Sequence, residues 1–184
     1  MKFTETRLKD LYIIEPKVFE DSRGYFVEAY NEKKFREFGL SYHWLQDNQS
    51  KSARGVIRGL HYQKEPHAQT KLIRVLEGSI LDVAVDIRTG SPTFGNVFTV
   101  ELSARNHKQL LVPRGFAHGF SVLSDSAVVF YKCDNLYNPA SEGGIVYNDA
   151  KLNIDWKIPG EEALVSTKDA QLPIFEKADM NFKI

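Results

Sequence analysis

The sequence has a single cysteine, no excess of charge of either sign and no long apolar run. Cys133 alone cannot form an intrachain disulfide and lacks the CxxC spacing of a redox or zinc site, so we interpret it as a small buried hydrophobe. Lys and Arg number 24, as do Asp and Glu. The balanced charge gives no positive field for nucleic acid or an anionic membrane, so an anionic ligand must be bound by a local group of side chains.

The apolar segments are too short for a membrane span, which needs roughly 20 residues. The opening stretch MKFTETRLKD is charged where a secretory signal has an apolar core. We therefore expect a cytosolic (cytoplasmic) protein with no membrane or nucleic-acid partner. The sequence has no internal repeat and no Pro/Gly/Ser-rich linker, so we expect residues 1–184 to form one domain.

The pattern of apolar residues predicts a mainly β chain. In NEKKFREFG, residues 31–39, Asn31 can start a short helix that carries apolar Phe35 and Phe38 three residues apart and stops at Gly39. From Leu72 onward, β-branched and aromatic runs alternate with turn residues: LIRVLEG, SILDVAVDI, NVFTVELS, KQLLVP, GFSVLS and AVVFYKC. This spacing predicts an antiparallel β-sandwich or jelly-roll barrel with one or two short helices.

Polar side chains interrupt these apolar segments at a few places. They are His61 in RGLHYQ, Lys71 in KLIRVL, His118 in PRGFAHGF and Tyr131 in AVVFYK, with Asp169 far along the chain in STKDAQ. A histidine oriented by an aspartate is a general base near neutral pH, a tyrosine can return a proton, and a lysine can stabilise an oxyanion. This set suits proton abstraction next to a carbonyl, and return of the proton on the other face inverts the carbon.

A metal site is the first alternative, because PRGFAHGF is similar to the second motif of the cupins. The first motif of a metal cupin carries two histidines separated by one residue and then a glutamate. Here LHYQKEPHAQTK has Gln63 in place of the second histidine, and Glu65 precedes a proline in a predicted turn. His61 and His118 alone make a poor metal site, so we expect no metal. A histidine held by hydrogen bonds in the core is the other alternative.

Further side chains could bind an anionic nucleotide. Arg58 and Lys168 could meet a diphosphate, and Tyr137 could stack on a base with Glu142 nearby as an acceptor. The remaining candidates lie in DSRGYFVEAY and LQDNQS: Arg23, Phe26, Glu28, Gln46, Asp47 and Asn48. Ordinary structural interpretations stay open for these side chains: Arg23 and Glu28 as a surface ion pair, Phe26 and Tyr137 as core aromatics, and Lys168 as a solvated charge.

The motifs DSRGYF, LQDNQS, GVIRGLHYQ, KLIRVLEGSILDVAVDIR, VPRGFAHGF and YKCDNLYNPASEGG follow one another in this order. Together, from about residue 7 to residue 175, they closely resemble the dTDP-4-dehydrorhamnose 3,5-epimerase family. The resemblance implies a cupin-like isomerase that inverts C3 and C5 of dTDP-4-dehydro-6-deoxyglucose without metal or organic cofactor. It also implies that the protein is a homodimer. The product of such an enzyme supplies the deoxysugar of surface polysaccharide.

The resemblance further implies a role for each candidate. His61 is the general base with Asp169 as its partner, Tyr131 is the general acid on the opposite face, and Lys71 stabilises the enolate oxygen at C4 with help from His118. The nucleotide sugar is bound by Arg23, Phe26, Glu28, Gln46, Asp47, Asn48, Arg58, Glu142 and Lys168, with Tyr137 stacking on thymine. An N-terminal segment of the partner subunit completes each site. The alternatives are a single-carbon epimerase or ketoisomerase, a nucleotide-sugar-binding module without catalysis, and a metal-dependent cupin enzyme.

Overall fold

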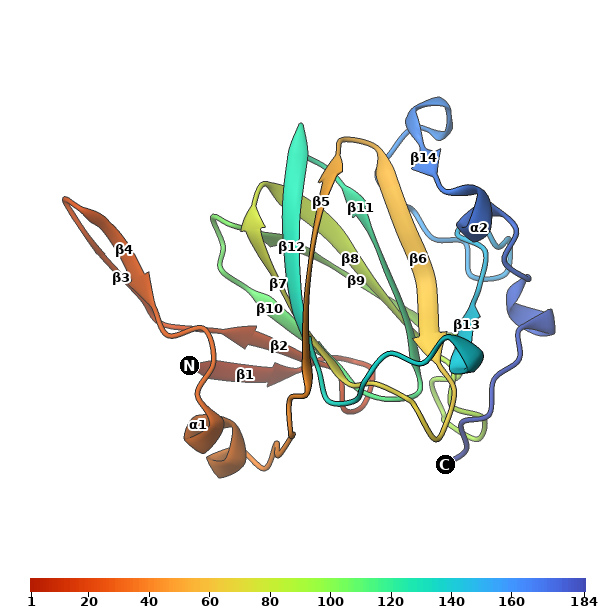
Figure 1. Ribbon diagram of the computed structural model, residues 1–184, viewed down its shortest axis with the longest axis horizontal. Coiled ribbons are helices and arrows are strands. Elements are labelled where there is room, and N and C mark those ends of the chain that lie inside the picture. Colours follow the sequence, from red (N-terminus) through yellow and green to blue (C-terminus); the bar gives the residue numbers. More distant parts are fainter.

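Two antiparallel sheets pack face to face in the computed structural model, which describes residues 1–184 (Figure 1). In the first sheet the strand order is β1-β2-β10-β7-β12-β5, and in the second it is β13-β6-β11-β8-β9, with the short β14 running parallel to β6. The sandwich confirms the predicted antiparallel architecture. It is an open sandwich rather than a closed barrel.

The strands of the first sheet are β1 (Lys2–Glu5), β2 (Tyr12–Glu15), β5 (Gln46–Ala53), β7 (Lys71–Glu77), β10 (Gln109–Val112) and β12 (Ser126–Cys133). Those of the second are β6 (Val56–Gln63), β8 (Ser79–Asp86), β9 (Val97–Ser103), β11 (Phe116–Val122), β13 (Glu142–Gly144) and β14 (Leu164–Val165). A separate hairpin joins β3 (Val18–Asp21) and β4 (Gly24–Val27). The helices are α1 (Glu32–Glu37) and α2 (Thr167–Ala170), with 3-10 turns at Pro139–Ser141, Gly160–Glu162 and Phe175–Lys177.

The predicted short helix is α1. The Asn31 side chain accepts a hydrogen bond from the backbone N–H of Lys34, which satisfies a donor that the first turn leaves unpaired. Phe35 is buried on the inner side of the helix, and Gly39 follows its end with a φ of 93°. No helix has the length and hydrophobicity needed to cross a membrane.

The six β-rich runs after Leu72 correspond to β7 through β12, as predicted. The sequence pattern did not predict β5, whose residues QDNQSKSA are all small or polar. Gln46, Asn48, Ser50 and Ser52 of this strand are partly or fully buried, and the residues between them are exposed. The strand therefore alternates with period two, but polar residues on both faces hide the alternation from a hydrophobicity pattern.

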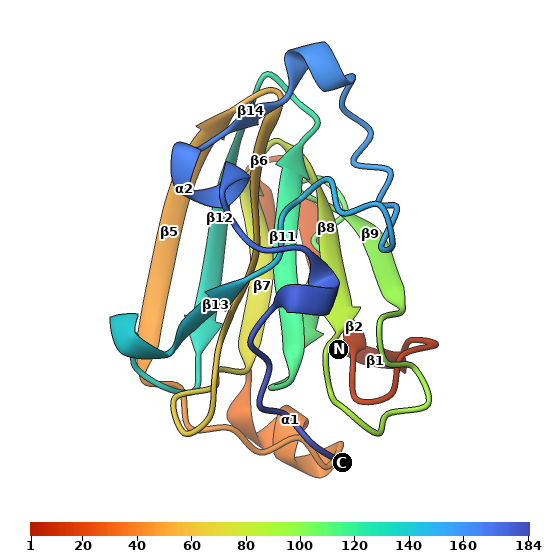
Figure 2. The same ribbon diagram turned by 90° about the vertical axis from the view of Figure 1, so that its right-hand side faces the viewer.

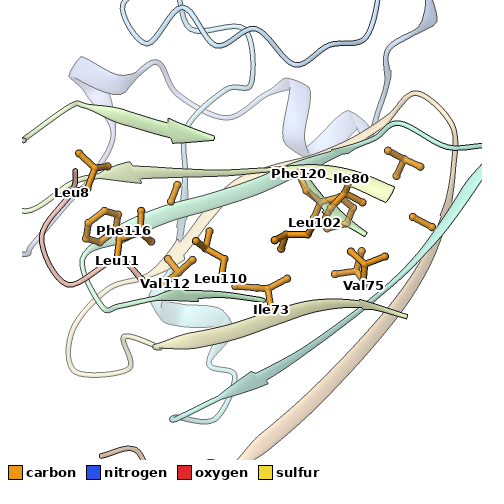
Figure 3. Packing of buried hydrophobic residues seen from close by; sticks show 14 residues of the cluster. Leu8, Leu11, Ile73, Val75, Ile80, Leu102, Leu110, Val112, Phe116 and Phe120 are labelled. Atoms are coloured by element: carbon orange, nitrogen blue, oxygen red, sulfur yellow. The ribbon is translucent and has the colours of Figure 1, made fainter. Parts of the chain in front are cut away.

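The main core lies between the two sheets. Its cluster of buried residues joins Ile73 and Val75 of β7 to Ile80 of β8 and Phe116 and Phe120 of β11 (Figure 3). Because side chains alternate along a strand, Ile80 and Ala84 of β8 face this core and every second residue between and after them faces outward. There Leu81, Val83 and Val85 form a second apolar cluster with Trp156 and Phe175 of the C-terminal segment, which crosses this face (Figure 2).

The β3–β4 hairpin projects away from the sandwich (Figure 1). Its aromatic side chains are exposed, with Phe19 at 52%, Tyr25 at 57% and Phe26 at 68% of their surface. Exposed aromatic groups in a contiguous patch are typical of an interaction site. This hairpin is therefore a candidate contact surface for another chain.

Candidate active site

A bulge in β6 places His61 in the interior of the sandwich. In the pairing of β6 with β11, His118 lies opposite His61 and Phe120 lies opposite Arg58, so β6 has one extra residue in this interval. Ile57 and Leu60 both pack in the outer cluster, although residues three apart on a regular strand point to opposite faces. The extra residue therefore brings His61 to the same face as Arg58.

Gly59 lies at this bulge, and only glycine fits there. Its φ is 112°, and a Cβ at this position would lie 2.6 Å from Cα of Gly119 and 2.7 Å from the carbonyl oxygen of His118. The Gly59 N–H, no longer used in the strand ladder, donates a hydrogen bond to Oδ2 of Asp169 at 3.1 Å. The bulge therefore orients the His61 side chain and also supplies the N–H group that holds Asp169.

His61 and Asp169 form a close pair across 108 residues of sequence, with 2.9 Å between Nε2 and Oδ1. Asp169 is buried at the start of α2, where its N–H is bonded to Oγ of Ser166. Burial tends to raise the pKa of Asp169, but the Gly59 N–H and the charge and hydrogen bond of His61 outweigh it and lower that pKa. A carboxylate only accepts, so the proton of neutral His61 is on Nε2 and the lone pair is on Nδ1.

The electrostatics of His61 suit a base. Burial lowers its pKa below the ordinary histidine value, although the charge and hydrogen bond of Asp169 favour the protonated form. His61 is therefore mainly neutral at neutral pH and still oriented by a carboxylate.

A cavity of about 260 Å³ opens beside His61, between β6 and the edge formed by β5, β7 and β12. Lys71 and Tyr131 line its wall on the first sheet, and Nζ of Lys71 lies 5.9 Å from the centre of the Tyr131 ring. Burial lowers the pKa of Lys71, against the opposing charge of Asp82 among others, and burial raises the pKa of Tyr131. The cavity is lined by Gln46, Asn48, His61, Tyr62, Gln63, Gln69, Lys71, Tyr131, Tyr137 and Glu142.

His118 is buried next to this cavity and does not line it. Its Nε2 lies 2.5 Å from Oδ1 of Asp82, and both residues are buried in the second sheet. The other oxygen of Asp82, Oδ2, is buried without a hydrogen-bond partner. Oδ2 of Asp82 is therefore an unused hydrogen-bond acceptor, and the charge of this carboxylate acts on Lys71.

Several nucleotide-binding candidates lie around the cavity mouth. Tyr137 is 52% exposed and so is no core aromatic, and Nζ of Lys168 lies 2.6 Å from Oε2 of Glu142. Nε of Arg58 donates to Oγ of Ser52 at 3.1 Å, on the side of His61 toward β14. Tyr137 and the Lys168–Glu142 pair thus lie at the cavity, whereas Arg58 lines a neighbouring pocket that shares His61 with it.

The structure leaves four candidates away from the cavity. Asp47 faces the opposite side of β5 from Gln46 and Asn48, and its oxygens accept from Lys132 at 3.0 and 3.1 Å. The other three, Arg23, Phe26 and Glu28, are on or directly after the projecting hairpin and line no part of the cavity. Arg23 pairs with Asp21 and Glu28 pairs with Lys34, so the two do not form the ion pair considered as an alternative.

The sequence analysis assigned no role in the cavity to Gln63, Gln69 or Asp82. Gln63 stands where a metal cupin has its second histidine, and its amide binds backbone groups of neighbouring loops. A glutamine in the place of that histidine was the available signal, but two of its three partners lie in a loop more than 70 residues away. No group of three or more His, Cys, Asp and Glu side chains is placed to hold a metal ion.

Comparison with known proteins agrees with this geometry. The family model described as dTDP-4-dehydrorhamnose 3,5-epimerase matches residues 5–177. An enzyme of this name from Shigella flexneri is 51% identical over 180 residues, which cover 97% of this chain and 98% of that relative. The crystal structure of the Elizabethkingia anophelis 3,5-epimerase has 60% identity and a TM-score of 0.92 over 96% of this chain and 97% of that one.

A second crystal structure carries a sugar nucleotide. It is the dTDP-6-deoxy-D-glucose-3,5-epimerase of Legionella pneumophila in complex with dTDP-4-keto-L-rhamnose, at 47% identity and a TM-score of 0.92. The match covers 97% of this chain and 94% of that one. Fold, cavity and near full-length similarity agree, and the chain belongs to the dTDP-4-dehydrorhamnose 3,5-epimerase family.

Proposed function

We propose that this protein inverts C3 and C5 of dTDP-4-dehydro-6-deoxyglucose and so forms dTDP-4-dehydro-rhamnose. The observation that carries the proposal is the convergence of His61, Tyr131 and Lys71 on one cavity from facing sheets. A base, an acid and an oxyanion partner around one cavity are what inversion next to a ketone requires. A protein that only binds a nucleotide sugar needs none of the three.

His61 is the general base of this proposal. Its Nδ1 takes the proton from C3 or C5, and the electron pair of the C–H bond moves to the C4 ketone oxygen to give an enolate. The ammonium group of Lys71, poorly solvated in its buried position, stabilises that oxygen. Asp169 keeps the proton of His61 on Nε2 and stabilises the imidazolium that forms.

Tyr131 completes the inversion. Its hydroxyl gives a proton to the carbon from the opposite face, and solvent then restores the phenol and removes the extra proton from His61. Burial raises the pKa of Tyr131, which keeps the phenol protonated until the enolate forms. C3 and C5 are both adjacent to C4, so the same three groups serve both inversions after the ring moves.

The nucleotide is held at the cavity entrance. Arg58 and Lys168 meet the diphosphate, Gln46, Asn48 and Glu142 offer polar contacts, and Tyr137 stacks on thymine. The carboxylate of Asp47 faces away from the cavity, so its contact with substrate would come through the backbone or a shifted side chain.

A second copy of the chain completes the site in this proposal. Arg23, Phe26 and Glu28 line no cavity of their own chain near His61, and the hairpin that carries Arg23 and Phe26 projects away from the body with its aromatic rings exposed (Figure 1). Docking of this hairpin on the partner would bury the rings and deliver the three side chains. The proposal places the homodimer in the cytosol, where a free buried thiol such as Cys133 stays reduced.

The test is incubation with dTDP-4-dehydro-6-deoxyglucose in deuterated water, with NMR detection of deuterium at each carbon. Label at C3 and C5 with inverted product is the expected result, and His61→Asn is the inactive control. Label at one carbon only would identify a single-carbon epimerase. Tight binding of dTDP without any label would identify a binding module and refute the proposal.

A further inference from the structure

The loop that carries Tyr137 has no regular secondary structure, yet its backbone at residues 136–138 is fixed by two glutamine side chains. The carbonyl of Leu136 accepts from Nε2 of Gln63 at 3.2 Å, and the N–H of Asn138 donates to Oε1 of Gln63 at 2.7 Å. Between them, the N–H of Tyr137 donates to Oε1 of Gln46 at 2.9 Å. Three consecutive residues of the loop are thus held from β5 and β6.

Gln63 is the central part of this arrangement. Its side chain is buried, with 6% of the residue exposed, and Nε2 also donates to the carbonyl of His67 at 2.6 Å. Both amide hydrogens and the amide oxygen are therefore in use. A flipped amide would set a donor against the Asn138 N–H, so only one orientation satisfies all three partners.

Tyr137 itself makes no aromatic pair within the chain and is half exposed at the cavity, although its backbone is held. A ring presented in this way is already in place before a ligand binds, and less conformational entropy is lost on stacking. The buried amide of Gln63 would be left unpaired if the loop moved away, which is unfavourable, so these hydrogen bonds keep the loop in place.

We propose that Gln63 is a positioning residue that sets the affinity for the nucleotide base by holding Tyr137 in its stacking position. The inference rests on the proposed function, since it takes Tyr137 as the residue that stacks on thymine. Gln63 acts through the loop and does not touch the reacting carbons. Nucleotide affinity and proton transfer thereby depend on different residues of the same strand, Gln63 and His61.

The test is a double-mutant cycle with Gln63→Met and Tyr137→Ala, using dTDP as the ligand in calorimetric titrations. Loss of the three hydrogen bonds should weaken dTDP binding about tenfold in Gln63→Met. In the Tyr137→Ala background the same change should alter the affinity by less than about twofold, because the ring that Gln63 positions is absent. Inorganic pyrophosphate, which has no base, should bind both forms equally.

The kinetic readout separates positioning from general destabilisation. Gln63→Met should raise KM for the nucleotide sugar about tenfold, while kcat falls less than about threefold. Asn106→Leu is the matched control: its amide also holds a turn by three hydrogen bonds, to Glu101, Ser103 and Lys108, away from the cavity. That variant should bind dTDP as the parent protein does.

Gln63→Glu provides a second variant of the same size. At neutral pH its carboxylate would face the carbonyl oxygens of Leu136 and His67, whereas the protonated acid regains one donor. Its dTDP affinity should therefore recover as the pH falls, more than that of the parent protein.

Two outcomes would overturn the inference. If Gln63→Met weakens dTDP binding by the same factor with and without Tyr137, the glutamine acts on the ligand directly. If Tyr137→Ala leaves dTDP affinity unchanged, the stacking role in the proposed function fails as well. The first result leaves that function intact, so the two failures are distinguishable.

Discussion

Replacing Asp169 by Asn gives the sharpest test of the proton-transfer site. The change keeps the shape of the side chain but removes its charge and half of its acceptor capacity. If the amide oxygen keeps the bond from the Gly59 N–H, the amide nitrogen faces Nε2 of His61 and donates to it. The ring proton then moves to Nδ1, the atom that should accept the proton of the substrate.

The expected effect of Asp169→Asn has two parts, the lost charge interaction with His61 and the wrong tautomer of the ring. Two unit charges about 4 Å apart interact by about 4 kcal/mol at an effective dielectric constant of about 20. The side chain of His61 is 35% exposed, and solvent screening roughly halves this interaction to about 2 kcal/mol. The wrong tautomer adds a loss of about 10²- to 10⁴-fold in kcat, as for an aspartate that orients a catalytic histidine.

The pH dependence has a definite sign. His61 must be unprotonated to act, and burial already lowers its pKa, so the acid limb of kcat/KM lies below the ordinary histidine value. The charge of Asp169 raises that pKa, so its removal in Asp169→Asn moves the acid limb further down. At neutral pH the rate stays low because the tautomer is wrong.

Deuterium exchange at C3 and C5, followed by NMR from pH 5 to pH 9, measures the rate, and a titration of the His61 ring resonances measures its pKa. The control is Asp155→Asn, which removes the charge of an exposed aspartate paired with Lys157. Exchange in Asp169→Asn within about threefold of the parent rate at neutral pH would refute the assignment of Asp169 as the partner of the base.

Three other predictions concern the acid, the bulge and the hairpin. Tyr131→Phe should allow deuterium exchange at C3 or C5 but suppress inversion, and inverted product at the parent rate would remove Tyr131 from the acid role. Gly59→Ala should lower the free energy of unfolding in urea by about 2–4 kcal/mol, because its Cβ meets the backbone of Gly119 at a φ of 112°. Phe26→Ser, which removes a ring 68% exposed in the single chain, should shift the dimer toward monomer in sedimentation and lower turnover; a parent-like dimer would contradict hairpin docking.

Local patterns along the chain were sufficient to predict the class of fold and the set of chemical groups. The β-rich runs from Leu72 onward and the Asn31 cap needed only local patterns, because side-chain alternation and helix capping act over a few residues. The motifs around His61 and His118 were also enough to indicate the family. The polar strand β5 was missed, because the signal for a strand is an apolar face and this strand has none.

Which of these groups meet depends on how the whole chain packs. One extra residue at the Gly59 bulge reverses the side-chain alternation and turns His61 toward the cavity. The sequence of β6 alone does not show this shift, because the register is defined by the hydrogen bonds to the neighbouring strand β11. Asp169 reaches His61 across 108 residues, and Gln63 holds the Tyr137 loop across more than 70. Such pairs form because two sheets and the C-terminal segment pack together, and that packing depends on the whole chain rather than on any local stretch of it.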